Sequence, residues 1–77
     1  MAKAYIMINC DKGFGDETLK ELRRVKHVTA ADVVYGVYDI VAVVQAPAMS
    51  AVEETIINKI RKVKGVSSTL TMLVAKT

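Results

Sequence analysis

The chain has 77 residues and a mass of 8.4 kDa, enough for one domain with a single small core. Hydrophobic residues make up 52% of it, which is more than so small a core can bury, so we expect a second subunit to cover part of the surface. The longest apolar run is too short to cross a bilayer, no signal peptide is evident, and one cysteine cannot form an internal disulfide. The sequence therefore predicts a single domain over residues 1–77 that is cytoplasmic, homo-oligomeric and not bound to a membrane.

The formal net charge is +3, and many basic residues fall in two groups near the ends of predicted helices. These groups are Arg23, Arg24 and Lys26, then Lys59, Arg61, Lys62 and Lys64. The helix dipole stabilises cations at helix C-termini, so the groups do not require a nucleic-acid partner. One phenylalanine and no tryptophan offer little surface for stacking bases. We expect no direct contact with nucleic acid, and a steep salt dependence of DNA affinity would be the sign of the opposite.

The first half of the chain begins with a strand over residues 3–10, where apolar residues alternate in part. Residues 11–15 have the composition of a turn. Asp16 is a suitable N-cap for a helix over Glu17–Lys26, whose apolar residues recur at helical spacing as Leu19, Leu22 and Val25. A second strand is predicted over residues 27–34.

A run of apolar residues from Ile40 to Val44 predicts the third strand, joined to the second by a hairpin turn containing Gly36. The run does not alternate with polar residues, so we expect this strand to be buried on both faces. Ser50–Glu53 fits a capping box that starts a second helix, and Gly65 fits its C-terminal end. The apolar face of that helix comprises Val52, Ile56, Ile60 and Val63.

Residues 66–75 predict the fourth strand, with Thr69, Thr71 and Leu73 on one face. The order β-α-β-β-α-β predicts an α+β fold, the ferredoxin-like βαββαβ sandwich, with both helices on one face of a four-stranded antiparallel sheet. The other face would be apolar, because the third strand is. We expect a second copy to pack there sheet to sheet, which makes the protein a dimer at minimum.

The residues that usually carry catalysis or bind metals show no productive pattern. His27 has no acidic or cysteine partner at zinc-ligand spacing, and Cys10 has no adjacent base. Gly13-Phe-Gly15 lacks the further residues of a phosphate-binding loop. The carboxylates show no clustered ligand pattern either, which applies to Asp32, Asp39, Glu53 and Glu54. We therefore predict no catalytic residue, no metal site and no cofactor.

The segment Gly36-Val37-Tyr38-Asp39 allows two interpretations. In one it is a hairpin turn in which glycine supplies a positive φ and the aspartate accepts from local backbone N–H groups. In the other it is a binding loop, where glycine lets the backbone approach a carboxylate and Asp39 accepts hydrogen bonds from an ammonium group. Physical chemistry alone leaves both open.

Three features carry a resemblance to a known family: Gly36-x-Tyr38-Asp39 before an apolar strand, residues 62–66 at the end of the second helix, and Thr69-x-Thr71 in the fourth strand. In this order of elements the chain resembles the effector-binding (RAM) domain of the Lrp/AsnC regulators. Family members usually carry an N-terminal helix-turn-helix domain. The first strand here begins near Ala4, so the chain is similar to the stand-alone members.

The resemblance implies binding of a small effector, typically an amino acid, at interfaces between subunits of dimers that assemble further. Full-length Lrp/AsnC regulators are the implied partners. By motif position the effector-binding residues would be Gly36, Val37, Tyr38, Asp39, Thr69 and Thr71. Leu70 departs from the charged or polar residue common in the family at that position, which removes a partner for a polar effector side chain.

An enzyme on the same dimeric scaffold, similar to a small monooxygenase or isomerase, is the alternative function, because this fold hosts many chemistries. Such an enzyme needs an acid–base residue facing a pocket. The available candidates, none with an evident partner, are His27, Asp32 and Tyr5.

Overall fold

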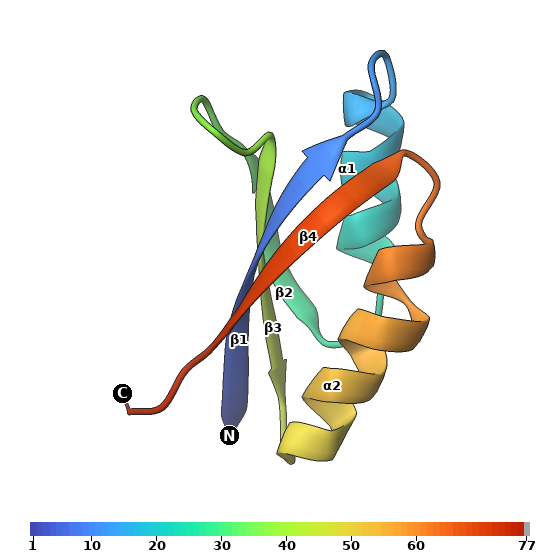
Figure 1. The fold of residues 1–77 in the computed structure, drawn as a ribbon. Coiled ribbons are helices and arrows are strands. Elements are labelled where there is room, and N and C mark those ends of the chain that lie inside the picture. The colour runs from blue at the N-terminus through green and yellow to red at the C-terminus, as the bar shows by residue number, and fades with distance from the viewer. Residues whose placement is uncertain (77) are drawn as a thin grey trace.

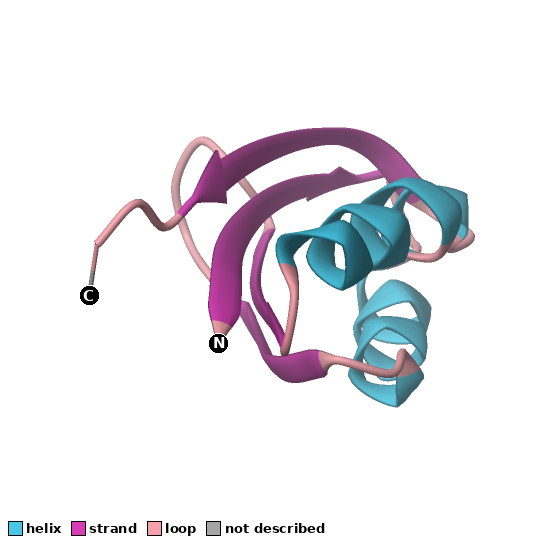
Figure 2. Cartoon of the chain, turned by 90° about the horizontal axis from the view of Figure 1, so that it is seen from below, coloured by secondary structure: helices cyan, strands magenta, loops and turns pink. Residues whose placement is uncertain are grey.

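The computed structural model describes residues 1–76. Its elements in order are β1 (Ala2–Cys10), α1 (Gly15–Arg24), β2 (Val28–Val33), β3 (Ile40–Ala46), α2 (Met49–Asn58), a 3₁₀ helix η1 (Ile60–Lys62) and β4 (Val66–Leu73). The strands form one antiparallel sheet in the order β2-β3-β1-β4 (Figure 1). Both helices lie on the same side of this sheet (Figure 2). The predicted ferredoxin-like α+β fold is confirmed. Within the described part of the chain, no helix is long and apolar enough to cross a membrane.

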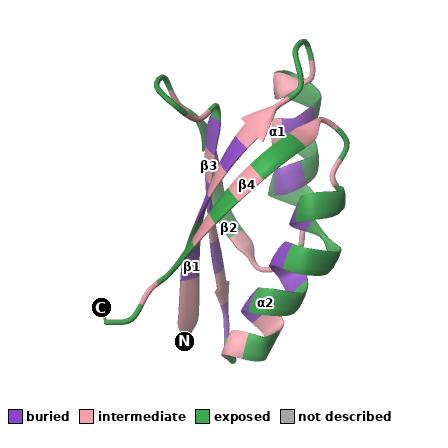
Figure 3. Cartoon of the chain, in the orientation of Figure 1, coloured by how far each residue is buried: buried purple, intermediate pink, exposed green. Residues whose placement is uncertain are grey.

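The core lies between the sheet and the helices (Figure 3). Side chains on a strand alternate between faces, so every second residue of β1 and β3 points toward the helices. Most of those residues are fully or almost fully buried, and they meet one apolar stripe from each helix. The sheet contributes Ala4, Ile6, Ile8, Ile40, Ala42, Val44 and Ala46, and the helices contribute Leu22, Val52, Ile56 and Ile60. Each buried aliphatic side chain of valine size or larger adds about 1.5–3 kcal/mol of transfer free energy.

The opposite face of the sheet is open in the single chain. Alternation places Tyr5 of β1 there, opposite Val43 of β3 and Met72 of β4. Leu70 and Met72 are each 46% exposed, and Val41 and Val43 are partly exposed. The prediction that β3 is buried on both faces is therefore not met by the chain alone, because its helices cover only one side of the sheet.

Both predicted helix N-caps are wrong. Helix α1 begins at Gly15 and has Phe14 at its N-cap position, so Asp16 lies within the first turn. Helix α2 begins at Met49 and has Ala48 at its N-cap position, without a side-chain cap. The Ala48 carbonyl already accepts from the N–H groups of Ala51 and Val52, which places the predicted Ser50 cap inside the helix. The chain enters α2 one residue after Pro47, and Glu53 lies beyond the first turn of the helix.

The predicted single helix up to Gly65 is instead two pieces. Helix α2 ends at Asn58, and the backbone tightens into η1 before extending at Val63. Ile60 remains fully buried, so the predicted apolar face is retained across the break. Gly65 has a φ of 93° and starts the turn into β4.

Candidate functional site

The loop of residues 34–39 connects β2 to β3 and projects from one end of the sheet (Figure 1). A hydrogen bond of 2.8 Å from the Val34 N–H to the Asp39 carbonyl closes it. Tyr35 is fully exposed, Val37 is 86% exposed, and Tyr38 is half-buried. Gly36 has a φ of 140°, and apart from its chain neighbours no atom of residues 1–76 lies within 4 Å of where its Cβ would stand. The loop therefore presents an aromatic and an aliphatic side chain that its own chain does not cover.

Asp39 holds this loop against the end of β1. Its Oδ2 accepts a 2.8 Å hydrogen bond from the Cys10 N–H, and its own N–H donates to the Ile8 carbonyl at 3.0 Å. The structural interpretation of Asp39 as an acceptor for a backbone N–H is thus part of its role. The carboxylate remains exposed. Within residues 1–76 only its Oδ2 accepts a hydrogen bond, which leaves Oδ1 open to a ligand.

Cys10 is the free thiol beside this loop. Burial raises its pKa, and the Asp39 carboxylate raises the pKa further, whereas the neighbouring Thr18 side chain lowers it. Asp11 adds a smaller effect that also raises the pKa. The thiol is therefore protonated at neutral pH and a weak nucleophile, in accord with a structural role.

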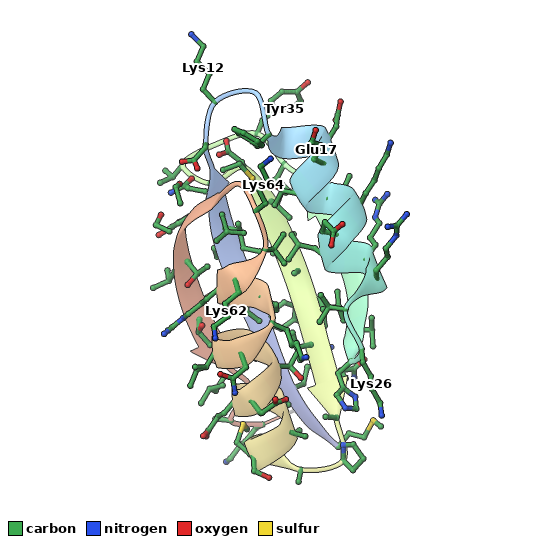
Figure 4. The ribbon with its side chains drawn as sticks, turned by 90° about the vertical axis from the view of Figure 1, so that its right-hand side faces the viewer. Lys12, Glu17, Lys26, Tyr35, Lys62 and Lys64 are labelled. Atoms are coloured by element: carbon green, nitrogen blue, oxygen red, sulfur yellow. The ribbon has the colours of Figure 1, made fainter. Side chains whose placement is uncertain are left out.

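A depression of about 360 Å³ separates the loop from the turn after β1. Its lining includes Cys10, Asp11, Lys12 and Gly13 from the turn and Val34, Tyr35 and Asp39 from the loop. Lys12 and Tyr35 both lie at this end of the molecule, and the Lys12 side chain is directed outward (Figure 4). The lining of the depression thus includes two acidic residues and one lysine, the residue types that can bind the two charges of a zwitterion. Asp11 and Lys12 are not among the site residues that the sequence predicts. They could have been found only from the predicted topology, because the end of β1, which they follow, meets the start of β3 in an antiparallel sheet.

Thr69 and Thr71 lie elsewhere. They are opposite Ile8 and Ile6 in the sheet register, so their side chains are on the helix side. Since β1 separates β4 from β3, Thr69 is two strands away from the start of β3, or about 10 Å. Thr71 lines a separate hollow of about 210 Å³ with Glu53, Ile56, Ile57, Arg61 and Leu73. Within one chain the two threonines and the loop do not form one site.

The Thr71 hydroxyl is an exception to the rule that buried polar atoms are paired. Its Oγ1 is buried and has no hydrogen-bond partner among the described residues. Such an atom costs about 1–3 kcal/mol when it stays unpaired.

The three residues considered for an enzyme are dispersed. His27 precedes β2 with a φ of 78°, and it lines a hollow with Lys26 and Glu54. Asp32 lies on β2, 3.8 Å from Arg23, and lines a different hollow. Tyr5 is on the open face of the sheet. No group of three or more metal-ligating side chains in residues 1–76 could hold a metal ion.

A family model described as the Lrp/AsnC ligand-binding domain matches residues 3–77. The chain is 31% identical to FFRP-DM1, covering 96% of this chain and 99% of that one with a TM-score of 0.90. It is 26% identical to E. coli AsnC, covering 99% of this chain and 52% of that one with a TM-score of 0.89.

The transcriptional regulator NMB0573 of Neisseria meningitidis, solved as an L-Met complex, shares the fold. Its identity is 18%, its TM-score is 0.83, and the alignment covers 97% of this chain and 50% of that one. The search of curated protein sequences found no match. Because the family model spans nearly the whole length, this chain belongs to the Lrp/AsnC ligand-binding domain family.

Proposed function

We propose that this chain is a non-enzymatic, oligomeric module that binds an amino acid as its effector and modulates full-length regulators of its family. The observation that carries the proposal is the depression between the loop and the turn after β1. It combines the carboxylates of Asp11 and Asp39 with the Lys12 ammonium in a ligand-binding family.

The chemistry of this depression suits a free amino acid. The Asp39 carboxylate accepts charge-assisted hydrogen bonds from an ammonium group, which are about twice as strong as neutral ones. Lys12 offers a cation for the α-carboxylate, and it stands on the outer side, where a ligand would approach. Tyr35 and Val37 supply apolar surface for an aliphatic or aromatic side chain.

Assembly is the second part of the proposal. The open face of the sheet carries apolar side chains at its centre, and burying them is favourable by about 25 cal/mol per Å². A second copy packed sheet to sheet would cover this face. Further contacts between dimers through the exposed loop would bring Thr69 and Thr71 of one copy toward Gly36–Asp39 of another, which a single chain cannot do.

A thermal-shift screen of the twenty amino acids tests the proposal, with L-methionine among the first probes. A ligand at about 100 times its Kd stabilises the folded state by about 2.7 kcal/mol, so binding should appear as a selective rise in Tm. Titration calorimetry of the selected amino acid should then show at least tenfold weaker binding for Asp39→Asn, because the variant removes a charge-assisted hydrogen bond. Asp32→Asn is the matched control, since it removes the same charge from the exposed face of β2.

Two results would contradict this function. No amino acid raising Tm at millimolar concentration would remove the effector assignment. Equal affinities of Asp39→Asn, Asp32→Asn and the unmodified chain would remove the site. Sedimentation addresses assembly separately: a single species of the 8.4 kDa chain mass at micromolar concentration would exclude the dimer.

A further inference from the structure

The outer surface of the two helices carries a groove that the proposed effector site does not use. We define the helix groove as the hollow of about 480 Å³ between α1 and the segment from α2 through η1. It continues into a neighbouring hollow of about 400 Å³ that shares Arg24, Val25 and Lys59 with it. Figure 4 looks onto this surface, with Glu17 on one side and Lys62 and Lys64 on the other.

The helix groove holds the whole net charge of the chain. Six of the eleven Lys and Arg residues and three of the eight Asp and Glu residues line it or its continuation. The five cations and five carboxylates that remain cancel, which leaves the formal charge of +3 in this one region. The residues concerned are Lys20, Arg24, Lys26, Lys59, Lys62 and Lys64, with Glu17, Glu21 and Glu54.

The helix dipole explains only part of this arrangement, namely Arg24 in the last turn of α1 and Lys62 in the last turn of η1. Lys20 lies in the middle of α1, and Lys64 follows η1. Arg23, at the end of α1, turns away to Asp32 and the Ala31 carbonyl on β2. Lys59 and Lys62 form no ion pair among the described residues, so their charges are available to a ligand.

We infer that the helix groove is a docking surface for an acidic segment of another protein. The groove has apolar area from Val25 and Val63, which an apolar anchor of a peptide can cover. Glu17 and Glu21 lie among the cations of the groove. These two carboxylates would repel a phosphate backbone, because its negative charge is uniform along its length. A peptide with spaced carboxylates can place its charges beside the cations and away from Glu17 and Glu21. Among the described residues that line the groove there is no phenylalanine, tyrosine or tryptophan to stack bases, which favours protein over nucleic acid.

The test measures fluorescence anisotropy of a labelled acidic helical peptide with leucines at i and i+4 spacing, against a labelled DNA duplex. We compare the unmodified chain with Lys59→Gln/Lys62→Gln. The control is Lys3→Gln/Lys76→Gln, which removes the same charge outside the groove and its continuation. Exposed ion pairs are individually weak, so the loss of two cations should weaken peptide binding by about two- to thirtyfold in the groove variant, and the control should bind as the unmodified chain does.

Peptide binding that weakens only in the groove variant, and weakens with added salt, supports the inference. Equal loss in the two double variants would mean that net charge alone drives binding, which overturns it. Absence of peptide binding also overturns it. DNA bound more tightly than the peptide, with the same loss in the groove variant, would replace the protein partner with a nucleic acid.

Discussion

The turn at Gly65 and the loop at Gly36 lie at the same end of the sheet, and each depends on a glycine with positive φ. Both are attached to the end of β1. The Asp11 N–H donates to the Gly65 carbonyl at 2.7 Å, and the adjacent Cys10 N–H donates to Asp39 Oδ2 at 2.8 Å. The difference is in what surrounds them. Phe14 and Thr18 of the α1 region pack directly against Gly65, whereas no described residue beyond its chain neighbours comes within 4 Å of the Cβ position of Gly36.

The two turns therefore differ in how far the chain itself packs around them. The Gly65 turn is fixed by its own chain, because Thr18 Oγ1 donates to the Lys64 carbonyl at 2.8 Å and the Lys64 ammonium lies 5.3 Å from the Phe14 ring centroid. The Gly36 loop instead exposes Tyr35 and Val37 to solvent. A loop that exposes apolar side chains and keeps a short anchor to the sheet is suited to contact a ligand or a second copy.

The largest predicted effect is the loss of stability on substituting Gly65. In Gly65→Ala the new Cβ would stand 2.7 Å from Phe14 Cβ and closer still to Thr18 Oγ1. The strained φ costs about 1–2 kcal/mol and overpacking about 1–3 kcal/mol, so we expect the free energy of unfolding to fall by about 3 kcal/mol. Gly36→Ala should cost about 1–2 kcal/mol, because only the backbone conformation is penalised.

Urea unfolding at one fixed protein concentration measures both values. Gly15→Ala is the control, since Gly15 opens α1 with no positive φ and no neighbour near its Cβ position. It should change stability by less than about 1 kcal/mol. Equal losses at Gly65 and Gly36 would show that packing does not distinguish the two turns.

Much of the fold could be predicted because it depends on local hydrophobic spacing. Alternation in residues 3–10 and the four-residue spacing of Val52, Ile56 and Ile60 each specify a buried face. The helix ends could not be predicted, since they depend on backbone geometry. Ser50 matches a cap by residue type, but the extended conformation falls at Ala48. Spacing also could not reveal the change from α2 to η1, because Ile60 is buried in either geometry.

The candidate site was predictable only in part. Gly36–Asp39 is continuous in sequence and is recognised as a motif, whereas Asp11 and Lys12 join it only through the pairing of β1 with β3. The shared face of Thr69 and Thr71 was predicted correctly. Which side of the sheet this face meets depends on the helices, so its orientation toward α2 required the structure.

The second prediction tests the hydrogen bond that fixes the Gly65 turn. Thr18→Val keeps the shape of the buried side chain but leaves the Lys64 carbonyl without its donor, which should cost about 1 kcal/mol in urea unfolding. Thr55→Val is the matched control. The Thr55 hydroxyl is also buried, but it donates to the Ala51 carbonyl within α2, so its loss should cost less than about 0.5 kcal/mol. A larger loss in Thr55→Val would contradict the role assigned to Thr18.

The smallest predicted effect is a change in the pKa of Cys10, which lies between the two turns. Burial raises the pKa of its thiol, the Asp39 carboxylate of the loop raises it further, and Thr18 beside the Gly65 turn lowers it. Asp39→Asn should therefore lower the pKa of Cys10 and Thr18→Val should raise it. The pH dependence of alkylation by iodoacetamide measures both changes. Asp32→Asn is the control and should leave the Cys10 pKa unchanged, because Asp32 does not act on the thiol.

The raised pKa of Cys10 makes the stability of the fold depend on pH. A thiol whose pKa is raised by folding keeps its proton where the unfolded thiol loses it, so the free energy of unfolding falls as the pH rises above the ordinary thiol pKa, until the folded thiol ionises. Asp39→Asn should narrow this pH window and Thr18→Val should widen it. If the pH midpoint of Cys10 ionisation moved in the same direction in both variants, the opposite roles of the two turns would be contradicted. Opposite movements would show that the Cys10 thiol responds to both the packed turn and the exposed loop, so that a ligand bound at the proposed site beside Asp39 should also change the reactivity of Cys10.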